Sequence, residues 1–302
     1  MQTLWPHVAR RVSRPPLQRE RLALADGDFL DCDWLVSGRS NAPLLLILHG
    51  LEGSSDSIYV RGLLSVCKTR GWRAVVAHFR GCSGEPNRKA RSYHCAATDD
   101  LDAIVTYLQE RTDTLAAVGY SLGGAVLLNW LAARGEGAPL HRAAAVSVPY
   151  DLHGAARRLD QGFSRVYQWG LLRAVKQSLR RKIARYGIPA LPSLAELNTF
   201  RRFDDAVTAP LHGFRDVDDY YTQASPLPKL RAIRVPTLLL HAADDPFVGD
   251  GRAPEPADLP ACVRLETAAH GGHVGFVYGR HPWAARYWLD ERLAAFFSTT
   301  LD

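Results

Sequence analysis

Six short apolar runs predict strands that are buried inside a sheet, and they lie at residues 43–49, 73–77, 115–118, 143–148, 236–241 and 262–266. The stretches at residues 57–70, 98–111, 122–134 and 282–299 are predicted to be helical. Because strands and helices alternate, we expect a mostly parallel central sheet flanked by helices on both faces. The pattern therefore predicts an α/β fold.

Two segments depart from this alternation. Residues 21–24 and 29–35 flank the turn sequence ADGD and predict an antiparallel hairpin at the edge of the sheet. Residues 149–233 show only helical and irregular patterns, although ordinary connections between elements have about 2–6 residues. We therefore expect a helical cap or lid at residues 149–233, inserted between two parts of the core at residues 1–148 and 234–302.

Length and composition favour one large globular domain that carries this insertion. The chain has 302 residues, of which 47% are hydrophobic and 23% are charged. Its five cysteines form an odd number and contain no CxxC pair, which argues against a disulfide framework and a zinc ribbon. The N-terminal residues lack the apolar run and the cleavage site of a secretory signal. These features predict a cytoplasmic protein.

The net charge of +6 raises the question of an anionic partner. Much of the excess lies in residues 165–185, which contain no acidic residue and predict an amphipathic helix with its basic residues mostly on the face away from the core. Two interpretations follow: a solvated helix face, or a peripheral contact with an anionic membrane or substrate. Nothing in the sequence is typical of nucleic-acid binding, so no nucleic-acid partner is expected. The basic residues are Arg173, Lys176, Arg180, Arg181, Lys182 and Arg185.

The twenty uncharged residues 114–133, TLAAVGYSLGGAVLLNWLAA, allow two interpretations. Their length suits a membrane-spanning helix of about 20 residues, and Gly119-x-x-x-Gly123 suits a dimerisation face. Alternatively, Gly119-x-Ser121-x-Gly123 predicts a sharp turn between a strand and a helix that exposes a catalytic serine. The glycines would remove side chains from that turn, and the helix start would favour the negative charge that develops during acyl transfer. The glycines at the centre of the segment favour the second interpretation.

Further parts of a hydrolase site follow other predicted strands. His49 and Gly50 end the strand at residues 43–49, so the backbone N–H of Leu51 is a candidate oxyanion donor beside that of Leu122. Asp245 follows the strand at residues 236–241 and is predicted to orient a histidine and stabilise its cation.

Neighbouring residues offer alternatives for two of these roles. Asp244 could replace Asp245, but we interpret it as a turn or helix-capping residue. The loop AAHGGHVGF follows the strand at residues 262–266, and within it His273 is the predicted general base and acid, with His270 as a supporting residue. Two histidines at this spacing could also bind a metal, but no acidic or cysteine ligand is evident nearby in the sequence, so no metal is expected.

Several motifs, in order along the chain, resemble those of the YheT-like α/β-hydrolases: HGLEGSSDSIYVRGL, AHFRGCSGEPNR, AVGYSLGG, TAPLHGFRDVDDYY, VPTLLLHAADDPF and HGGHVGF. The resemblance implies an α/β-hydrolase fold, a helical cap and a triad of Ser121, Asp245 and His273. The family includes eukaryotic relatives with acylglycerol lipase, phospholipase and ethyl-ester esterase or synthase activity, so the resemblance implies no single substrate. Cys95 and Ala96 stand where the family pattern would carry Ser-Gly.

The sequence therefore predicts a serine hydrolase that cleaves small-molecule carboxylic esters through an acyl-enzyme, with no cofactor. Aromatic residues of the cap are expected to meet an apolar acyl chain. The segment HFRGCSGEPNR is interpreted as a turn held by hydrogen bonds or as part of the pocket wall. Two alternatives stay open: acyl transfer to an alcohol acceptor, which uses the same triad, and a protein of this fold that binds a ligand without turnover.

Overall fold

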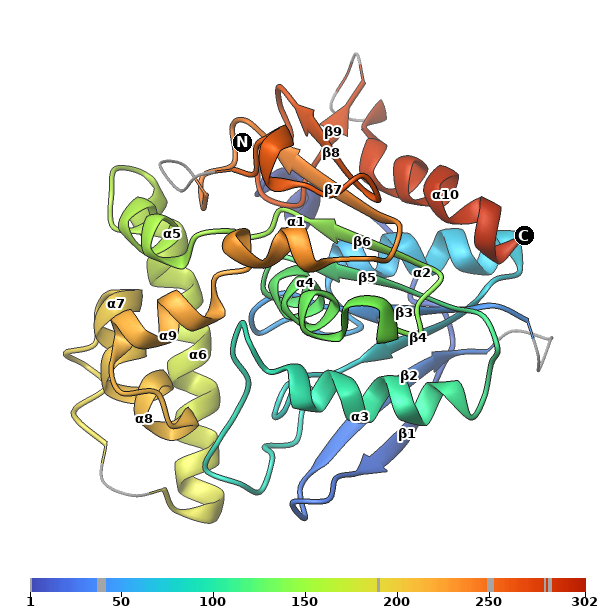
Figure 1. Ribbon diagram of the computed structural model, residues 1–302. Coiled ribbons are helices and arrows are strands. Elements are labelled where there is room, and N and C mark those ends of the chain that lie inside the picture. The colour runs from blue at the N-terminus through green and yellow to red at the C-terminus, as the bar shows by residue number, and fades with distance from the viewer. Residues whose placement is uncertain (1, 37–41, 189–190, 249–252, 280, 282–283) are drawn as a thin grey trace.

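An eight-stranded sheet forms the centre of the computed structural model, which describes residues 2–36, 42–188, 191–248, 253–279, 281 and 284–302 (Figure 1). The strands occur in the spatial order β1-β2-β4-β3-β5-β6-β7-β8, in which β1 and β2 form an antiparallel hairpin at one edge and β3 to β8 are parallel. Their bounds are β1 (Leu17–Ala23), β2 (Phe29–Leu35), β3 (Leu44–Leu48), β4 (Arg73–Ala77), β5 (Leu115–Tyr120), β6 (Arg142–Val146), β7 (Thr237–Ala242) and β8 (Val263–Ala268). The predicted α/β fold is confirmed.

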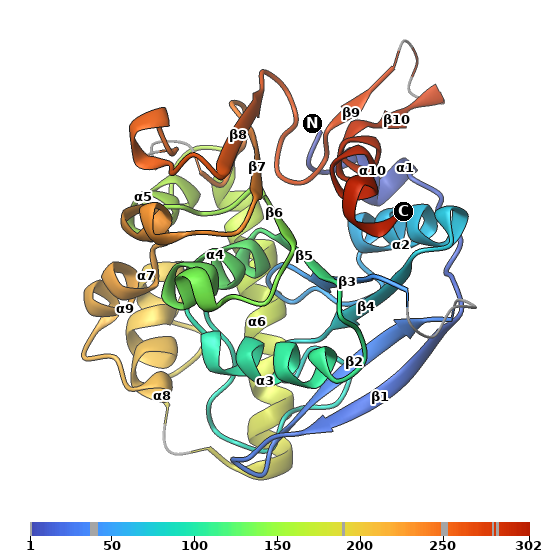
Figure 2. The ribbon, with the colours of Figure 1, turned by 45° about the vertical axis from the view of Figure 1, so that its right-hand side comes forward.

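The central strands are apolar on both faces because helices cover both faces. All five residues of β3 are fully buried, as expected for a parallel strand between two helix layers. Helices α3 (Thr98–Gln109) and α4 (Leu122–Arg134) cover one face, and α2 (Ile58–Arg70) and α10 (Trp288–Leu301) cover the other (Figure 2). Each face therefore has its own apolar core.

Residues 114–133 form a strand, a sharp turn and a helix instead of one continuous helix. Helix α4 is apolar on all sides because residues Leu122 to Leu131 are all buried, between β5, α3 and the η3 turn (Leu227–Ala232). Within the part of the chain that the structure describes, no helix has the length and apolar character needed to cross a membrane.

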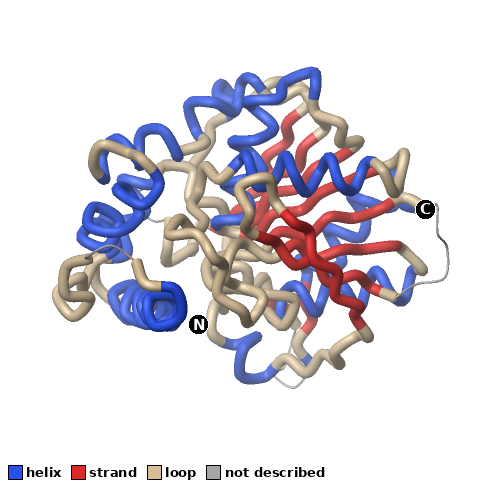
Figure 3. The backbone as a smooth tube through the Cα atoms, turned by 90° about the horizontal axis from the view of Figure 1, so that it is seen from below, coloured by secondary structure: helices blue, strands red, loops and turns tan. Residues whose placement is uncertain are grey.

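The described residues of 149–233 contain helices and loops but no strand, and we refer to them as the insertion. The insertion lies to one side of the sheet, and its long helix α6 runs along the outside of the molecule (Figures 1 and 3). It has a small apolar core of its own, with Leu172, Leu179 and Phe203 at its centre. Its elements are α5 (Leu152–Leu159), α6 (Ser164–Tyr186), α7 (Phe200–Phe203), the π turn η2 (Asp204–Thr208), α8 (Ala209–His212), α9 (Val217–Ala224) and η3.

Helix α6 has the predicted amphipathic character, with one basic residue that is not on the solvent face. Leu172 and Leu179 are buried and Arg173 and Arg180 are exposed, as expected. Lys182, however, is only 4% exposed, and its Nζ donates to the Ala90 and Arg91 carbonyls and to Ser92 Oγ at 3.1, 2.7 and 2.9 Å. This lysine therefore attaches the insertion to the loop that follows β4.

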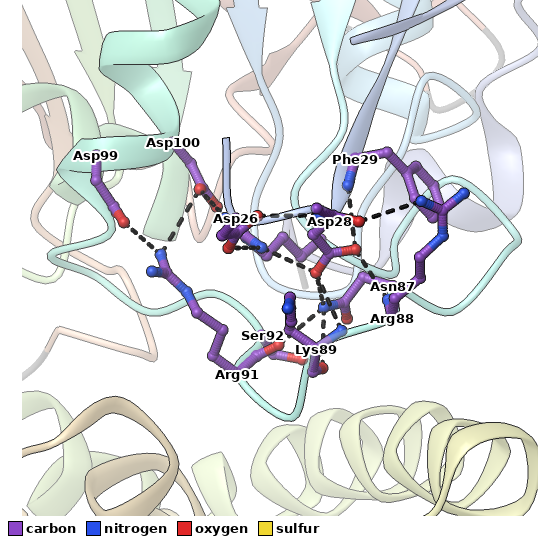
Figure 4. Close-up of polar contacts among 12 residues, drawn as sticks. Asp26, Asp28, Phe29, Asn87, Arg88, Lys89, Arg91, Ser92, Asp99 and Asp100 are labelled. Atoms are coloured by element: carbon purple, nitrogen blue, oxygen red, sulfur yellow. Dashed lines mark hydrogen bonds and ion pairs between the residues drawn. The ribbon is translucent and has the colours of Figure 1, made fainter. Parts of the chain in front are cut away.

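The other side of that loop is held by a buried charge network (Figure 4). Arg80, directly after β4, binds Asp100 of α3 through two hydrogen bonds of 2.8 and 2.6 Å, and it donates to Asp26 and Asp28 of the β1–β2 turn at 2.8 Å each. Asn87 Nδ2 donates to Asp28 at 2.6 Å and to the Arg91 carbonyl at 2.8 Å. The interpretation of HFRGCSGEPNR as a hydrogen-bonded turn is confirmed.

Three smaller elements and one corrected boundary complete the description of the fold. A short helix α1 (Trp5–Ala9) precedes the hairpin, and η1 (Gly135–Gly137) and η4 (Pro256–Asp258) are single turns. The predicted C-terminal helix begins at Trp288, because Arg286–Tyr287 (β10) pairs with Val277–Tyr278 (β9) as a small ribbon. The predicted start at residues 282–283 lies outside the described residues.

Candidate active site

Ser121 occupies the turn between β5 and α4 in a backbone conformation that few non-glycine residues adopt, with φ 52° and ψ −117°. Close backbone contacts explain the glycines around it. A Cβ atom at Gly119 would lie 2.4 Å from the Gly123 carbonyl oxygen, and one at Gly123 would lie 2.4 Å from the His49 carbonyl oxygen. The Ser121 N–H also donates to the Val146 carbonyl at 2.8 Å. The turn is thus tied to β6 and β3 and points the serine away from the sheet.

Three predicted residues from distant parts of the chain meet at this turn. His273 Nε2 lies 2.9 Å from Ser121 Oγ, and His273 Nδ1 lies 2.9 and 3.1 Å from the two carboxylate oxygens of Asp245. A carboxylate, an imidazole and a hydroxyl in this series can activate the hydroxyl oxygen as a nucleophile, because the imidazole takes its proton.

The two neighbouring aspartates have different contacts. Asp245 is 4% exposed at the end of β7, and its Oδ1 also accepts the Phe247 N–H at 2.8 Å. Asp244 Oδ1 accepts the N–H groups of Gly271 and Gly272 at 2.7 Å each, so it fixes the loop that carries His273. Those two hydrogen bonds help lower the pKa of Asp244 against the opposing effect of burial.

His270 does not reach the serine. Its side chain is 79% exposed, and its Nδ1 lies 3.6 Å from Asp244 Oδ2. At this position His270 contacts Asp244 and can contribute only to the conformation of the loop. Among the described residues, no group of three or more histidine, cysteine or carboxylate side chains has the arrangement of a metal site.

Three residues that sequence reasoning did not identify hold the His273 loop. Thr3 Oγ1 accepts the His273 N–H at 2.9 Å, Ser147 Oγ accepts the Val274 N–H at 3.1 Å, and the Phe247 ring stacks on the imidazole with ring centres 4.0 Å apart. Thr3 lies 270 positions from His273, so no local pattern connects the two. Phe247 lies two residues after Asp245 in the motif DDPF, and Ser147 lies in the segment VSVPYDL at the end of the predicted strand 143–148.

The candidate oxyanion donors lie at the start of α4 and after β3. Leu122 is the first residue of α4, and within the described chain no acceptor takes the N–H of Leu51 or of Leu122. His49 is fully buried, with Nδ1 2.7 Å from the Gly50 carbonyl and Nε2 accepting the Phe79 N–H at 3.2 Å. Burial lowers the pKa of His49 to about 3, so it is a neutral structural support for this turn. The Gly50 N–H donates to Tyr59 Oη at 2.9 Å.

A cavity of about 530 Å³ opens at Ser121 and His273. Its walls come from the loop after β3, from α5 and α6 of the insertion, and from the chain start. Most of these side chains are apolar, among them Leu152, Leu159, Tyr167, Leu171, Tyr220 and Phe247. A smaller cavity of about 100 Å³ adjoins it at Leu51 and Leu122.

Two carboxylates, Glu52 and Asp204, line both cavities, and neither forms an ion pair within the described part of the chain. Asp204, in the π turn, accepts hydrogen bonds from Thr208 Oγ1 at 2.6 Å and from Tyr221 Oη at 2.8 Å. Burial raises its pKa to about 6, and these two hydrogen bonds only partly oppose that effect.

Comparisons with known proteins show the family to which the chain belongs. A family model described as the alpha/beta hydrolase fold matches residues 43–279. The chain is 42% identical over 311 residues to YheT of Escherichia coli (strain K12), a match that covers 100% of this chain and 91% of that protein. It is 32% identical over 289 residues to phospholipase ABHD3 of Mus musculus, covering 91% of this chain and 70% of that protein.

A solved structure shares the fold at low sequence identity. The esterase Pf2001 of Pyrococcus furiosus has a TM-score of 0.59 against this chain at 14% identity, and the match covers 98% of both chains.

Proposed function

Because the chain belongs to the α/β-hydrolase family, we propose that it is a serine hydrolase that cleaves carboxylic esters with Ser121, His273 and Asp245 as its catalytic triad. The observation that carries the proposal is the hydrogen-bonded series from Asp245 through His273 to Ser121 at a strained turn. The family match and the named phospholipase relative support an ester substrate.

The proposed reaction proceeds in two steps on the same residues. His273 Nε2 takes the proton of Ser121 Oγ while that oxygen attacks the acyl carbon, and the N–H groups of Leu51 and Leu122 bind the oxyanion. The tetrahedral intermediate expels the alcohol, which receives the proton from His273, and leaves the acyl group on Ser121. Water then loses a proton to His273 and attacks the acyl carbon. The second tetrahedral intermediate expels Ser121 Oγ, which takes the proton back from His273, and the acid is released.

Asp245 acts through His273. Its carboxylate accepts the Nδ1–H, so Nε2 is the nitrogen that faces the serine, and its charge stabilises the imidazolium after proton transfer. The N–H of Phe247 and the stacked Phe247 ring limit movement of both side chains.

The insertion at residues 149–233 acts in this proposal as a cap that supplies the acyl-chain site. Support comes from the apolar side chains of α5 and α6 that line the large cavity next to Ser121. A fatty acyl chain is the substrate part that matches such walls, and lipid esters are therefore the proposed substrate class.

Hydrolysis of p-nitrophenyl esters from acetate to palmitate tests the proposal, with wild type compared to folded Ser121→Ala. Loss of a triad nucleophile is expected to lower kcat by about 10⁶-fold. A fluorophosphonate probe should label the wild type and not the variant. An unlabelled and inactive wild type would contradict the proposal and favour a ligand-binding role for the cavity.

A further inference from the structure

We propose that the mouth of the large cavity docks on an anionic lipid bilayer through two exposed apolar clusters, one on α1 and one at the start of α6. The α1 cluster is Leu4, Trp5 and Val8, and the α6 cluster is Phe163, Val166 and Trp169. The inference rests on the proposed function, because it concerns how the same site reaches a lipid ester.

The exposed apolar side chains are concentrated in these two segments. Among the described residues, six of the nine large apolar side chains that are exposed belong to the two clusters. Val8 is 84% exposed, Phe163 66% and Trp169 64%. Single exposed apolar residues are ordinary on a protein surface, whereas a cluster of them is typical of an interaction site.

Both clusters border the same cavity. Leu4 and Val166 are exposed to solvent and also line the cavity that opens at Ser121. Figure 3 shows the start of the chain next to the long helix α6, which is viewed nearly along its axis. A bilayer that covers both clusters would therefore cover the mouth between them. An acyl chain could then enter the apolar cavity without crossing water.

The α6 cluster has the side-chain order of an interfacial helix. Phe163, Val166 and Trp169 are three positions apart and so lie on one side of the helix start. The next exposed residue on that side is Arg173, whose guanidinium lies 5.5 Å from the Trp169 ring centre. Aromatic side chains beside arginine are typical of the boundary between lipid headgroups and acyl chains.

The charge around the clusters selects an anionic surface as the partner. The sequence has no acidic residue from position 161 to position 195. Arg165, Arg173 and Arg180 are exposed, and no carboxylate in the described chain pairs with any of them. Exposed Arg11, just after α1, adds a fourth such cation. Cations that have no carboxylate partner and lie next to exposed apolar residues attract anionic lipid headgroups.

The two clusters also have short connections to His273. Thr3, next to Leu4, accepts the His273 N–H. Phe163 contacts Tyr167, Tyr167 contacts Phe247, and Phe247 stacks on His273, with ring centres 5.7, 5.2 and 4.0 Å apart. The proposed docking surface is therefore continuous with the proposed catalytic site.

Co-sedimentation of the full chain with vesicles of phosphatidylcholine, with and without phosphatidylglycerol, tests the proposal. Val8→Ser with Trp169→Ser removes one side chain from each cluster and leaves the cavity walls intact. Val36→Ser with Tyr186→Ser is the matched control, because both residues are exposed but lie at the opposite edge of the sheet and at the far end of α6. The cluster variant is expected to bind anionic vesicles about tenfold or more weakly than wild type, and the control as tightly as wild type.

The role of charge is tested with a second pair of variants. Arg165→Glu with Arg173→Glu should abolish the preference for phosphatidylglycerol, whereas Lys68→Glu with Arg264→Glu, which reverses two exposed cations elsewhere, should retain it. Turnover of a soluble p-nitrophenyl acetate should persist in every variant and serves as the check on folding. If no protein hydrolyses that ester, the proposed function fails while vesicle binding still tests the docking surface.

Three results would overturn the docking proposal. They are wild-type protein that does not bind anionic vesicles, a cluster variant that binds as tightly as wild type, and a control variant that loses as much binding as the cluster variant. Analytical ultracentrifugation tests whether a second copy of the chain covers the clusters instead. A wild-type dimer that becomes monomeric in the cluster variant, without vesicle binding, would assign the clusters to that second copy.

Discussion

Two adjacent aspartates that follow β7 differ in the groups that they bind. Asp245 binds the His273 ring, whereas Asp244 binds the backbone of the loop that carries it. Sequence reasoning selected Asp245 from its place before Pro246, and it assigned Asp244 only a turn or capping role. The contacts of Asp244 with Gly271 and Gly272 join two segments that local sequence patterns do not connect.

Asp245→Asn is expected to lower kcat by about 10⁴-fold while KM changes little, because an amide can hold the imidazole in the wrong tautomer and cannot stabilise its cation. Asp244→Asn is the matched control, since an amide oxygen can still accept the Gly271 and Gly272 N–H groups. Steady-state kinetics on one p-nitrophenyl ester compares the two. Equal losses in both variants would argue that Asp245 has only a structural role.

The raised pKa of Asp204 predicts that the free energy of unfolding depends on pH. Because burial raises its folded-state pKa to about 6, above the ordinary value of 3.8, its favourable contribution is present below about pH 4 and is lost as the pH rises through 6. Asp204→Asn should therefore raise the free energy of unfolding by up to about 3 kcal/mol near pH 8 and change it little near pH 4.

Urea denaturation of wild type and Asp204→Asn at several pH values between these limits measures the difference. Asp205→Asn, at an exposed neighbouring carboxylate, is the control and should give a difference that does not vary in this way. A constant difference between Asp204→Asn and wild type across the range would contradict the raised pKa.

At the scale of elements, helix α6 shows that sequence periodicity predicts the buried apolar face of a helix but not every buried residue on it. The apolar positions Leu172 and Leu179 define its buried face, yet Lys182 is buried as well. A lysine on an amphipathic helix is normally solvated. The burial of Lys182 is compensated by two carbonyls and the Ser92 hydroxyl in a loop some ninety residues earlier. Reversal of charge at Arg180, Arg181 and Lys182 together would therefore disrupt this contact as well as change the surface charge.

Lys182→Met is expected to lower the free energy of unfolding by about 1–3 kcal/mol, because the carbonyls of Ala90 and Arg91 lose a buried donor. It should also raise KM for a long-chain ester, since α6 forms a wall of the cavity. Arg180→Met on the exposed face is the control and should change neither quantity appreciably. Urea denaturation and ester kinetics provide the measurements, and identical behaviour of the two variants would rule out the attachment role.

Elements with strong local patterns were predicted well, and those that depend on distant partners were not. The buried strands β3 and β5 and the turn at Ser121 follow from apolar runs and glycine spacing alone. The start of α10 depends on the pairing of Arg286–Tyr287 with Val277–Tyr278, and the π turn at Asp204 has no comparable sequence signal. The contact of Thr3 with His273 likewise depends on the whole fold.

At the scale of the whole molecule, the network around Arg80 joins the N-terminal hairpin, the loop after β4 and helix α3 (Figure 4). Lys182 then joins the same loop to the insertion. The same loop also supplies Tyr93, whose hydroxyl donates to the Glu52 carboxylate at 2.8 Å beside Leu51. Arg80 therefore supports, from a distance, the position of the insertion and of the loop that carries the candidate oxyanion donor Leu51.

Removal of Arg80 should consequently affect the whole molecule. Its side chain is 2% exposed, and Asp28 and Asp100 are nearly as deeply buried, so Arg80→Met leaves buried carboxylates without their cation. The expected loss is about 3–5 kcal/mol of unfolding free energy near pH 7. Arg88→Met is the control in the same loop, because Arg88 is exposed and, among the described residues, its side chain contacts the Gly27 carbonyl and the Phe29 ring but no carboxylate.

The pH dependence of the stability lost in Arg80→Met distinguishes the loss of charge pairs from the loss of side-chain packing. Burial raises the pKa of Asp28, but hydrogen bonds from Asn87, from the Arg88 N–H and from Arg80 lower it by more, so the stability it contributes is lost as the pH falls below its ordinary value. Without Arg80, the part of that stability that its hydrogen bond supplies is absent at every pH. The deficit of Arg80→Met in urea denaturation should therefore shrink as the pH falls from about 4 to about 2, where the wild type loses the same contribution. A deficit that stays constant over this range would instead assign the cost to lost packing of the arginine side chain.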